Sequence, residues 1–342
     1  MTKSNYTIAT LGSHSALQIL KGAKDEGFKT LIVVKKDREE FYKSFPFIDE
    51  FMVLSDFSEF PSIEKKLIEK NVILIPHGSF VAYLGSEKNK NMKAMYYGNK
   101  NVLDWEEDRR KQREWLISAG VNVPKQFDFK DEPVTYPIIA KSYGAAGGKG
   151  YFYAKNKTDF EKKITTFGDK KFIVQEYVIG VPLYIHYFYS PITDKLEIMS
   201  MDRRYETNAD GIGRIPLLGQ EGLDIEPSYV VVGNSELVLR ESMLPEAFEM
   251  GRKTIEASRK LVDKKGIFGP FCLETIITPD ARFFVLEISC RIVAGTNLFT
   301  NGSSYSWLYY NTPMSTGRRI AREINIAIEK NKLSLILDDD DR

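Results

Sequence analysis

The chain has 342 residues, of which 43% are hydrophobic and 28% charged, and its 48 basic and 47 acidic residues leave a formal charge of +1. This length predicts two domains, or one large domain with a subdomain, around ordinary globular cores. A charge so close to zero offers no broad basic surface for nucleic acid or an acidic membrane, although it still allows a local basic pocket.

Strands alternate with helical stretches over the first 80 residues, the strands lying at 6–11, 29–34, 50–54 and 71–76. This alternation predicts an α/β fold with a parallel, doubly wound N-terminal sheet. Ligands of such sheets bind beyond the carboxyl ends of the strands. The loops 12–15 and 77–79 occupy that position, and they carry His14, His77 and Ser79. A charged helix is then predicted over 104–120, with Asp104 as its N-cap.

The pattern changes after residue 124. From 136 to 201 the chain is dominated by strands, and a helix at 244–265 precedes a final pair of strands. We predict three parts: a doubly wound domain over 1–124, a small α+β unit over 125–200 and a C-terminal domain over 201–342. The N-terminal residues lack the apolar stretch of a signal peptide, and no apolar run is long enough to cross a bilayer. A cytoplasmic protein is expected.

The final pair of strands carries two glutamates. Residues 271–289 read as a hairpin with a Pro-Asp turn, and a two-residue loop at 280–281 would place Glu274 directly opposite Glu287. Like charges there repel, and carboxylates together with substrate phosphates are the usual ligands of Mg²⁺. The hairpin therefore predicts a magnesium–nucleotide site. The alternatives are two solvated carboxylates, or an odd-length loop that puts them on opposite faces.

The same register places Cys272 opposite Ser289 and turns Cys290 to the other face, so neither a disulfide nor a zinc site is expected. The glycine-rich segment 141–150 is followed by a strand and matches neither the P-loop nor the dinucleotide fingerprint. Such a hairpin loop can cover nucleotide phosphates, with Lys141 as a point charge. The alternative is an ordinary flexible turn with a surface lysine.

Three further features allow two interpretations each. The strand 172–178 could form the wall of an adenine pocket, although taken by itself the segment favours a plain core strand. Arg291, with Arg203 and Arg204 as further candidates, could contact a transferring phosphoryl group or form a surface salt bridge. His186 lies in an aromatic strand, which favours a structural role.

In chain order these segments resemble the ATP-grasp superfamily, which combines a doubly wound N-terminal domain, a lid with a glycine-rich hairpin and a C-terminal domain with two magnesium-binding acids. Within it the chain is similar to the archaeal, folate-independent formate ligases of purine biosynthesis. The similarity runs nearly end to end, through IATLGSHSAL, MYYGNKNVLDWEEDRRKQREWL, AKSYGAAGGKGYF, VQEYVIGVPLYIHYFY and LEISCRIVAGTNLF. One departure is Lys100, which stands where the resemblance leads us to expect arginine.

The resemblance implies a carbon–nitrogen ligase that joins formate to the 5-amino group of 5-aminoimidazole-4-carboxamide ribonucleotide (AICAR). ATP would become ADP and phosphate, by way of formyl phosphate. Two alternatives stay open: a ligase for another carboxylate and amine, and a non-catalytic nucleotide-binding paralogue. A homo-oligomer is expected from the resemblance alone.

The resemblance also implies roles for individual residues. Glu274 and Glu287 would hold Mg²⁺, or Mn²⁺ in its place, and Lys141 and Arg291 would be catalytic. Lys141 and the loop would cover the ATP phosphates, with contacts from Gly147, Gly148 and Lys149. The rest of the nucleotide would meet Gln175, Glu176, Val178 and Glu206. The ribonucleotide substrate would be held by His14, Ser79 and Asn234.

Overall fold

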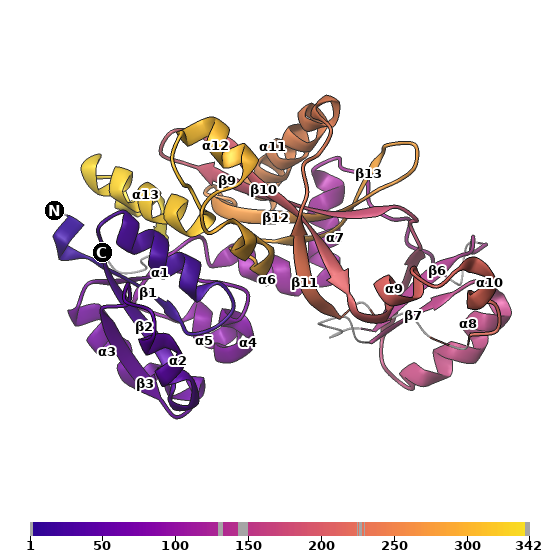
Figure 1. The fold of residues 1–342 in the computed structure, drawn as a ribbon, viewed down its shortest axis with the longest axis horizontal. Helices are drawn as coiled ribbons and strands as arrows, with labels where there is room; N and C mark the ends of the chain where they lie inside the picture. The colour runs from indigo at the N-terminus through magenta and orange to yellow at the C-terminus, as the bar shows by residue number, and fades with distance from the viewer. Residues whose placement is uncertain are drawn as a thin grey trace.

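The computed structural model describes residues 3–128, 133–142, 150–223, 225, 228 and 230–338. Within them the strands form three sheets, of six, five and three strands. In Figure 1 the six-stranded sheet lies at the left, the five-stranded sheet in the centre and the small sheet at the right. The predicted α/β fold is confirmed. No helix of the described ranges combines the length and the apolar content that crossing a membrane requires.

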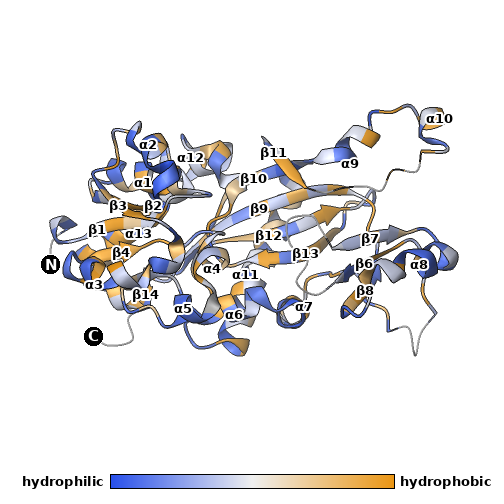
Figure 2. Ribbon diagram, turned by 90° about the horizontal axis from the view of Figure 1, so that it is seen from below, coloured by the Kyte–Doolittle hydropathy of each residue, from blue (hydrophilic) through white to orange (hydrophobic). Residues whose placement is uncertain are grey.

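The N-terminal sheet has the strand order β14-β5-β4-β1-β2-β3. Its strands are β1 (Thr7–Leu11), β2 (Lys29–Lys35), β3 (Glu50–Leu54), β4 (Val72–Leu74), β5 (Met95–Tyr97) and β14 (Leu337–Asp338). The first five pair in parallel, and β14 is antiparallel to β5. Every residue of β1 is buried, as expected for a strand covered on both faces. Figure 2 shows the hydrophobic colour concentrated on β1 to β4.

Helices surround this sheet: α1 (Ala16–Asp25), α2 (Glu39–Lys43), α3 (Pro61–Glu69), α4 (Phe80–Leu84), α5 (Ser86–Lys90) and α13 (Thr316–Glu329). The C-terminal helix α13 lies beside α1, far from it in sequence (Figure 1). The two helices touch through glycines: a Cβ on Gly317 would lie 2.3 Å from Gln18 O, and one on Gly22 would lie 2.2 Å from Arg318 N. Helix α13 therefore packs on the N-terminal lobe.

Gly317→Ala should destabilise the protein by about 1–3 kcal/mol, because the new methyl group meets backbone atoms that cannot rotate away. Urea denaturation measures the difference. Gly211→Ala, in α9 (Thr207–Ile212), is the matched control, since a Cβ there meets nothing within 4 Å. Equal stability of the two variants would show that the helices separate at little cost.

The predicted helix over 104–120 is wrong as one element, because two helices occupy the region: α6 (Asn101–Glu107) and α7 (Arg109–Ser118). The Asp108 carboxylate, not Asp104, is the N-cap of α7, and it accepts bonds from the backbone amides of Arg110 and Lys111. An aspartate that offers its side chain to nearby backbone amides favours a helix end over a helix interior. The break has a functional consequence, because the end of α6 carries Glu106 to the candidate site.

The small sheet has the order β7-β6-β8 and consists of β6 (Ile138–Ser142), β7 (Tyr151–Ala154) and β8 (Phe172–Glu176), with α8 (Lys157–Ile164) packed on it. Its own core includes Phe152, Phe160 and Val174. The sheet ends at Glu176, so the expected boundary at 200 falls inside the next sheet. The reason is that β9 (Val181–Ser190) is buried on both faces from Leu183 onward, as befits a central strand of a larger sheet.

That larger sheet is antiparallel, with the order β11-β10-β9-β12-β13. Its other strands are β10 (Lys195–Glu206), β11 (Val231–Glu236), β12 (Gly269–Ile277) and β13 (Phe283–Ser289). Helices α10 (Leu217–Gln220) and α12 (Ser304–Tyr310) follow its strands, and α11 (Leu244–Leu261) covers one face, where the Tyr187 hydroxyl donates to Ala247 O. The opposite face carries polar side chains.

Candidate active site

Glu274 on β12 lies directly opposite Glu287 on β13, and Cys272 lies opposite Ser289, as predicted. The structure reaches this register by a different route. Thr278 pairs with Arg282 around a three-residue turn in which Ala281 is left-handed (φ 61°). A β-bulge between Glu274 and Thr275 then adds one residue to β13 and restores the facing pair. The odd loop alone would have separated the two carboxylates.

The glutamate pair continues across the sheet into a row of polar side chains. Tyr184 on β9 faces Glu274, and Arg204 on β10 faces Asn234 on β11. The Arg204 guanidinium lies 3.6 Å from the centre of the Tyr184 ring, and its Nη1 is 3.3 Å from Glu274 Oε1. Arg204, rather than Arg203, is therefore the arginine that joins the glutamates. Arg203 turns to Asp210, with Nη2 2.9 Å from Oδ1.

Electrostatics in this row favour an added cation. Burial raises the pKa of the Glu274 carboxyl to about 7, and the charge of Glu287 acts in the same direction, while Arg204 and Arg291 oppose them. The described residues contain no cluster of three or more acids, histidines or cysteines that could hold a metal by themselves. Two hard carboxylates without a third protein ligand fit a Mg²⁺ ion that completes its shell with phosphate oxygens and water.

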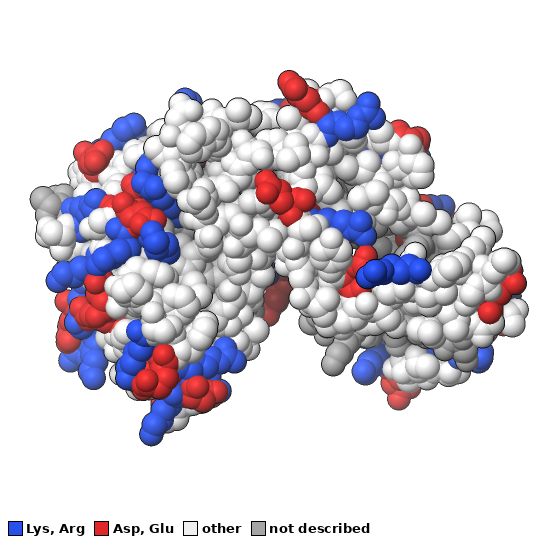
Figure 3. Space-filling model, viewed as in Figure 1, with Lys and Arg blue, Asp and Glu red and all other residues white. Residues whose placement is uncertain are grey.

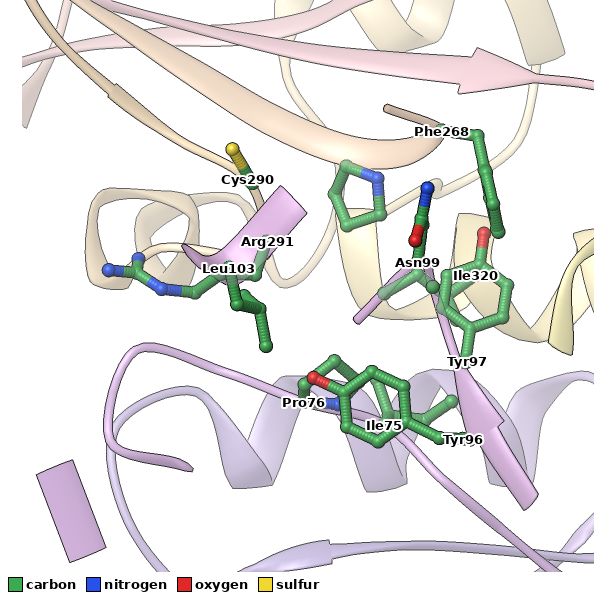
Figure 4. A pocket seen from close by; sticks show the side chains of 12 residues that line it. Ile75, Pro76, Tyr96, Tyr97, Asn99, Leu103, Phe268, Cys290, Arg291 and Ile320 are labelled. Carbon is green, nitrogen blue, oxygen red and sulfur yellow. The ribbon is translucent and has the colours of Figure 1, made fainter. Parts of the chain in front are cut away.

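Arg291, just beyond β13, is oriented by the N-terminal lobe. Its Nη2 lies 2.7 Å from Oε1 of Glu106, and Oε2 of Glu106 accepts a bond from the Cys290 N–H at 2.7 Å. Figure 4 shows the Arg291 guanidinium pointing away from the rings of Tyr97 and Phe268, which line an apolar pocket between the lobes. Sequence reasoning missed Glu106, because its partner lies 185 positions away.

A backbone bridge brings the N-terminal loops to the same place. His77, after β4, pairs with Ile292, the residue after Arg291. The His14 and His77 rings stack with centroids 5.4 Å apart. His77 Nε2 donates to Leu11 O at 2.9 Å, so Nδ1 is free to accept the Ser79 N–H at 3.2 Å. A neutral His77 thus fixes the loop that presents Ser79.

Burial lowers the pKa of His77 to about 4, and burial with the charges of His77, Arg291 and Arg204 lowers that of His14 to about 3. The folded state therefore holds fewer protons than the unfolded chain between pH 6.5 and pH 4. Above pH 6.5 the histidine is neutral in both states and costs no stability. As the pH falls from 6.5 to 4, only the unfolded chain takes up the proton, and the resulting loss of folding stability from His77 reaches about 2 kcal/mol at pH 5.

Denaturation of the wild type and of His77→Gln at pH 7.5 and pH 5 tests this shift. The wild type should lose about 2 kcal/mol more than the variant between the two pH values, because only the wild type must keep a buried imidazole neutral. His186→Gln is a control for loss of a histidine elsewhere in the core. If wild type and His77→Gln lost the same free energy of unfolding between the two pH values, the lowered pKa of His77 would be contradicted.

A cluster of hydroxyl groups lies beside these loops. Ser13 Oγ is 2.9 Å from Tyr83 OH and 3.5 Å from Ser79 Oγ. The bond to Ser13, together with the nearby Arg38 guanidinium, lowers the pKa of Tyr83. Tyr83 and Arg38 escaped sequence reasoning because they follow different strands, and only the parallel sheet brings those strand ends together.

The predicted nucleotide residues lie partly together. A cavity between α7, the small sheet and β13 is lined by Arg109, Arg113, Lys141, Gln175 and Leu286. Burial and the charge of Arg109 lower the pKa of Lys141, while the charges of Glu287 and Glu274 act to raise it. Arg109 and Arg113 were missed, although their spacing of four residues on one helix face was a readable signal.

Six other predicted nucleotide residues are placed less directly. Gly147, Gly148 and Lys149 lie outside the described residues. The Glu176 N–H is taken by Lys125 O at 2.8 Å, and neither Glu176 nor the half-buried Val178 lines the cavity. Glu206 ends β10, where burial and Asp210 raise its pKa to about 7. These remain predictions.

Lys100 is buried in the N-terminal lobe. Its ammonium donates to Met92 O at 2.6 Å and lies over the Tyr96 ring. The replacement of the expected arginine by lysine therefore bears on packing in that lobe and leaves the glutamate face unchanged.

An N-terminal parallel sheet, a small sheet with a lysine directed at a cavity, and an antiparallel sheet with paired glutamates define the chain as an ATP-grasp protein. Two family models match, "Protein of unknown function (DUF1246)" over residues 8–127 and "Domain of unknown function (DUF1297)" over 152–338. The chain belongs to the family of 5-formaminoimidazole-4-carboxamide-1-(beta)-D-ribofuranosyl 5'-monophosphate synthetases, as the following similarities show.

The family member of Pyrococcus abyssi is 51% identical over 98% of this chain and 100% of its own length. That of Saccharolobus solfataricus is 48% identical over 96% and 99%. The crystal structure of an IMP biosynthesis protein PurP from Thermococcus kodakaraensis has a TM-score of 0.79 at 32% identity, covering 97% of this chain and all of that one. N5-carboxyaminoimidazole synthetase from Staphylococcus aureus, at 16% identity and a TM-score of 0.62 over 86% and 74%, shares the fold.

Proposed function

We propose that this protein is an ATP-dependent ligase that formylates AICAR with formate, releasing ADP and phosphate. The observation that carries the proposal is the facing pair Glu274 and Glu287, with the His14 and Ser79 loops held against it by the His77–Ile292 bridge. One lobe thus presents a metal–phosphate site, and the other presents polar groups for a second substrate. Figure 3 shows the surface indented between the left and right lobes.

In this scheme Glu274 and Glu287 hold Mg²⁺, which neutralises charge on the ATP phosphates; Mn²⁺ has the same ligand preference. Lys141 adds a fixed positive charge from the small sheet, with Gln175 in the same cavity. Arg291, held by Glu106, lies on the side of the N-terminal loops. A positive charge there stabilises the phosphoryl group during transfer.

The chemistry follows from the weakness of formate as an acyl donor. Transfer of the γ-phosphoryl group from ATP to a formate oxygen gives ADP and formyl phosphate. The 5-amino nitrogen then attacks the formyl carbon, phosphate leaves with the electrons of the C–O bond, and the nitrogen loses a proton. Splitting one difficult displacement into two easier ones leaves the protein mainly to orient reactants and to neutralise charge.

The ribonucleotide would span the N-terminal loops and the glutamate face. Its phosphate suits the cluster of Ser13, Ser79, Tyr83 and Arg38, which combines hydroxyl donors with a guanidinium. His14 lies between this cluster and Arg291, and Asn234 lies on the glutamate face. The 5-amino group would then face the formyl carbon of formyl phosphate, which it attacks.

ADP release from ATP, Mg²⁺ and formate, measured with and without AICAR, tests the proposal. Turnover should require both co-substrates. Acetate in place of formate should give little ADP, whereas turnover with acetate would indicate a ligase for another acid. Tight binding of Mg·ATP without any turnover would instead indicate a non-catalytic paralogue.

A further inference from the structure

Asp202 on β10 has no part in the scheme above, yet it is the most enclosed carboxylate near the site. Its side chain is fully buried. Oδ2 accepts a hydrogen bond from the Asn234 amide nitrogen at 2.6 Å, and Oδ1 accepts one from His186 Nε2 at 2.5 Å. Both carboxylate oxygens are therefore occupied by donors from neighbouring strands.

The main chain of a neighbouring turn lies close to the Asp202 carboxylate. A Cβ on Gly295, in the 3-10 turn Ala294–Phe299 above the sheet, would lie 2.3 Å from Oδ1. His186 is 1% exposed, and its Nδ1 has no hydrogen-bond partner among the described residues. A histidine with one bond only, directed at Asp202, acts as a fixed support for that carboxylate.

This arrangement determines which end of the Asn234 amide is turned toward Asp202 and which end is turned away from it. A carboxylate accepts hydrogen bonds and cannot donate them, so the amide nitrogen of Asn234 must face Asp202. The amide oxygen then points away from Asp202. Asn234 is only half-buried, and it stands opposite Arg204, which contacts Glu274. Its oxygen is therefore available on the glutamate face.

We propose that Asp202 is a positioning residue that fixes the Asn234 amide with its oxygen toward the ribonucleotide, where it accepts a hydrogen bond from an amine or amide N–H. The inference rests on the proposed function, since it assigns that substrate to this face. The fixed orientation of the Asn234 amide makes the site selective for a ligand that has an N–H donor at this point. A ligand with only acceptors there would meet an oxygen that cannot turn away.

This role is tested by exchanging the side chains at positions 202 and 234. The affinities for AICAR and for Mg·ADP are measured by calorimetry at pH 8. Asn234→Asp places two carboxylates in contact and should weaken AICAR binding tenfold or more, with Mg·ADP binding unchanged. In the double variant Asp202→Asn/Asn234→Asp, the new amide at 202 donates to the carboxylate at 234. The second oxygen of that carboxylate still accepts from the substrate, so AICAR affinity should return to within about threefold of wild type.

Asn234→Ala provides a variant that leaves the buried Asp202 and His186 in place, and it should also weaken AICAR binding about tenfold. The proposal is overturned if Asn234→Ala binds AICAR like wild type, or if the folded double variant binds no better than Asn234→Asp. Because binding is measured without turnover, the positioning role of Asp202 and the proposed ligase reaction are tested independently of each other. AICAR binding with recovery by exchange, but no formate-dependent ADP release, would remove the proposed reaction and keep this inference.

Discussion

Glu287→Gln is expected to lower formate-dependent ADP release by about 10²- to 10³-fold. The substitution keeps the shape of the side chain and removes the charge that, with Glu274, would hold Mg²⁺ on the phosphates. Loss of several kcal/mol of charge stabilisation in the transition state corresponds to that range. The effect should fall mainly on turnover, and raising the Mg²⁺ concentration should recover part of it if the metal site is weakened. Steady-state kinetics over a range of Mg²⁺ concentrations measures both.

Glu246→Gln is the matched control, since Glu246 is an exposed residue at the start of α11. It removes the same charge without touching the hairpin and should leave turnover within twofold of wild type. Full activity of Glu287→Gln, or equal loss in both variants, would show that the facing carboxylates are not the metal site.

Arg319→Met is expected to lower the free energy of unfolding by about 3–5 kcal/mol. Arg319 on α13 is 3% exposed and reaches two buried acids: its Nε lies 3.0 Å from Glu197 Oε2, and its Nη1 lies 2.8 Å from Glu323 Oε2. Tyr310 donates to Glu197, and Ser190 donates to Glu323. Removing the arginine leaves two carboxylates inside the core without a cation, which is the costly way to break a buried ion network.

Urea denaturation of Arg319→Met and Arg252→Met separates burial from charge. Arg252 is exposed and pairs with Glu249 and Glu256 on its own helix, so its loss should cost less than about 1 kcal/mol. A double-mutant cycle with Glu197→Gln should show that the two losses do not add, because both variants remove the same pair. Independent, additive losses would mean that Arg319 stabilises the fold by packing on Phe188 alone.

Local pattern predicted much of this protein correctly. The alternation of strands and helices predicted the parallel sheet. The facing glutamates were predicted from a two-residue loop, and the structure reaches the same pairing through a three-residue turn and a β-bulge. The alternation also placed His14 and Ser79 in loops at one edge of that sheet, and the structure brings these loops together. These features depend on residues close in sequence, or on the rule that parallel strands end at one edge. The homo-oligomer and the loop residues Gly147, Gly148 and Lys149 stay predictions.

Sequence alone therefore determined the fold class and the hairpin that carries the two glutamates. Only the tertiary structure decided what surrounds that pair. The contact of Glu106 with Arg291 and the contact of Asp202 with Asn234 join segments remote in sequence, whereas the β-bulge that restores the glutamate register lies within the hairpin itself. Side-chain contacts of this kind leave no periodicity, because their energy comes from groups that meet only when the chain has folded.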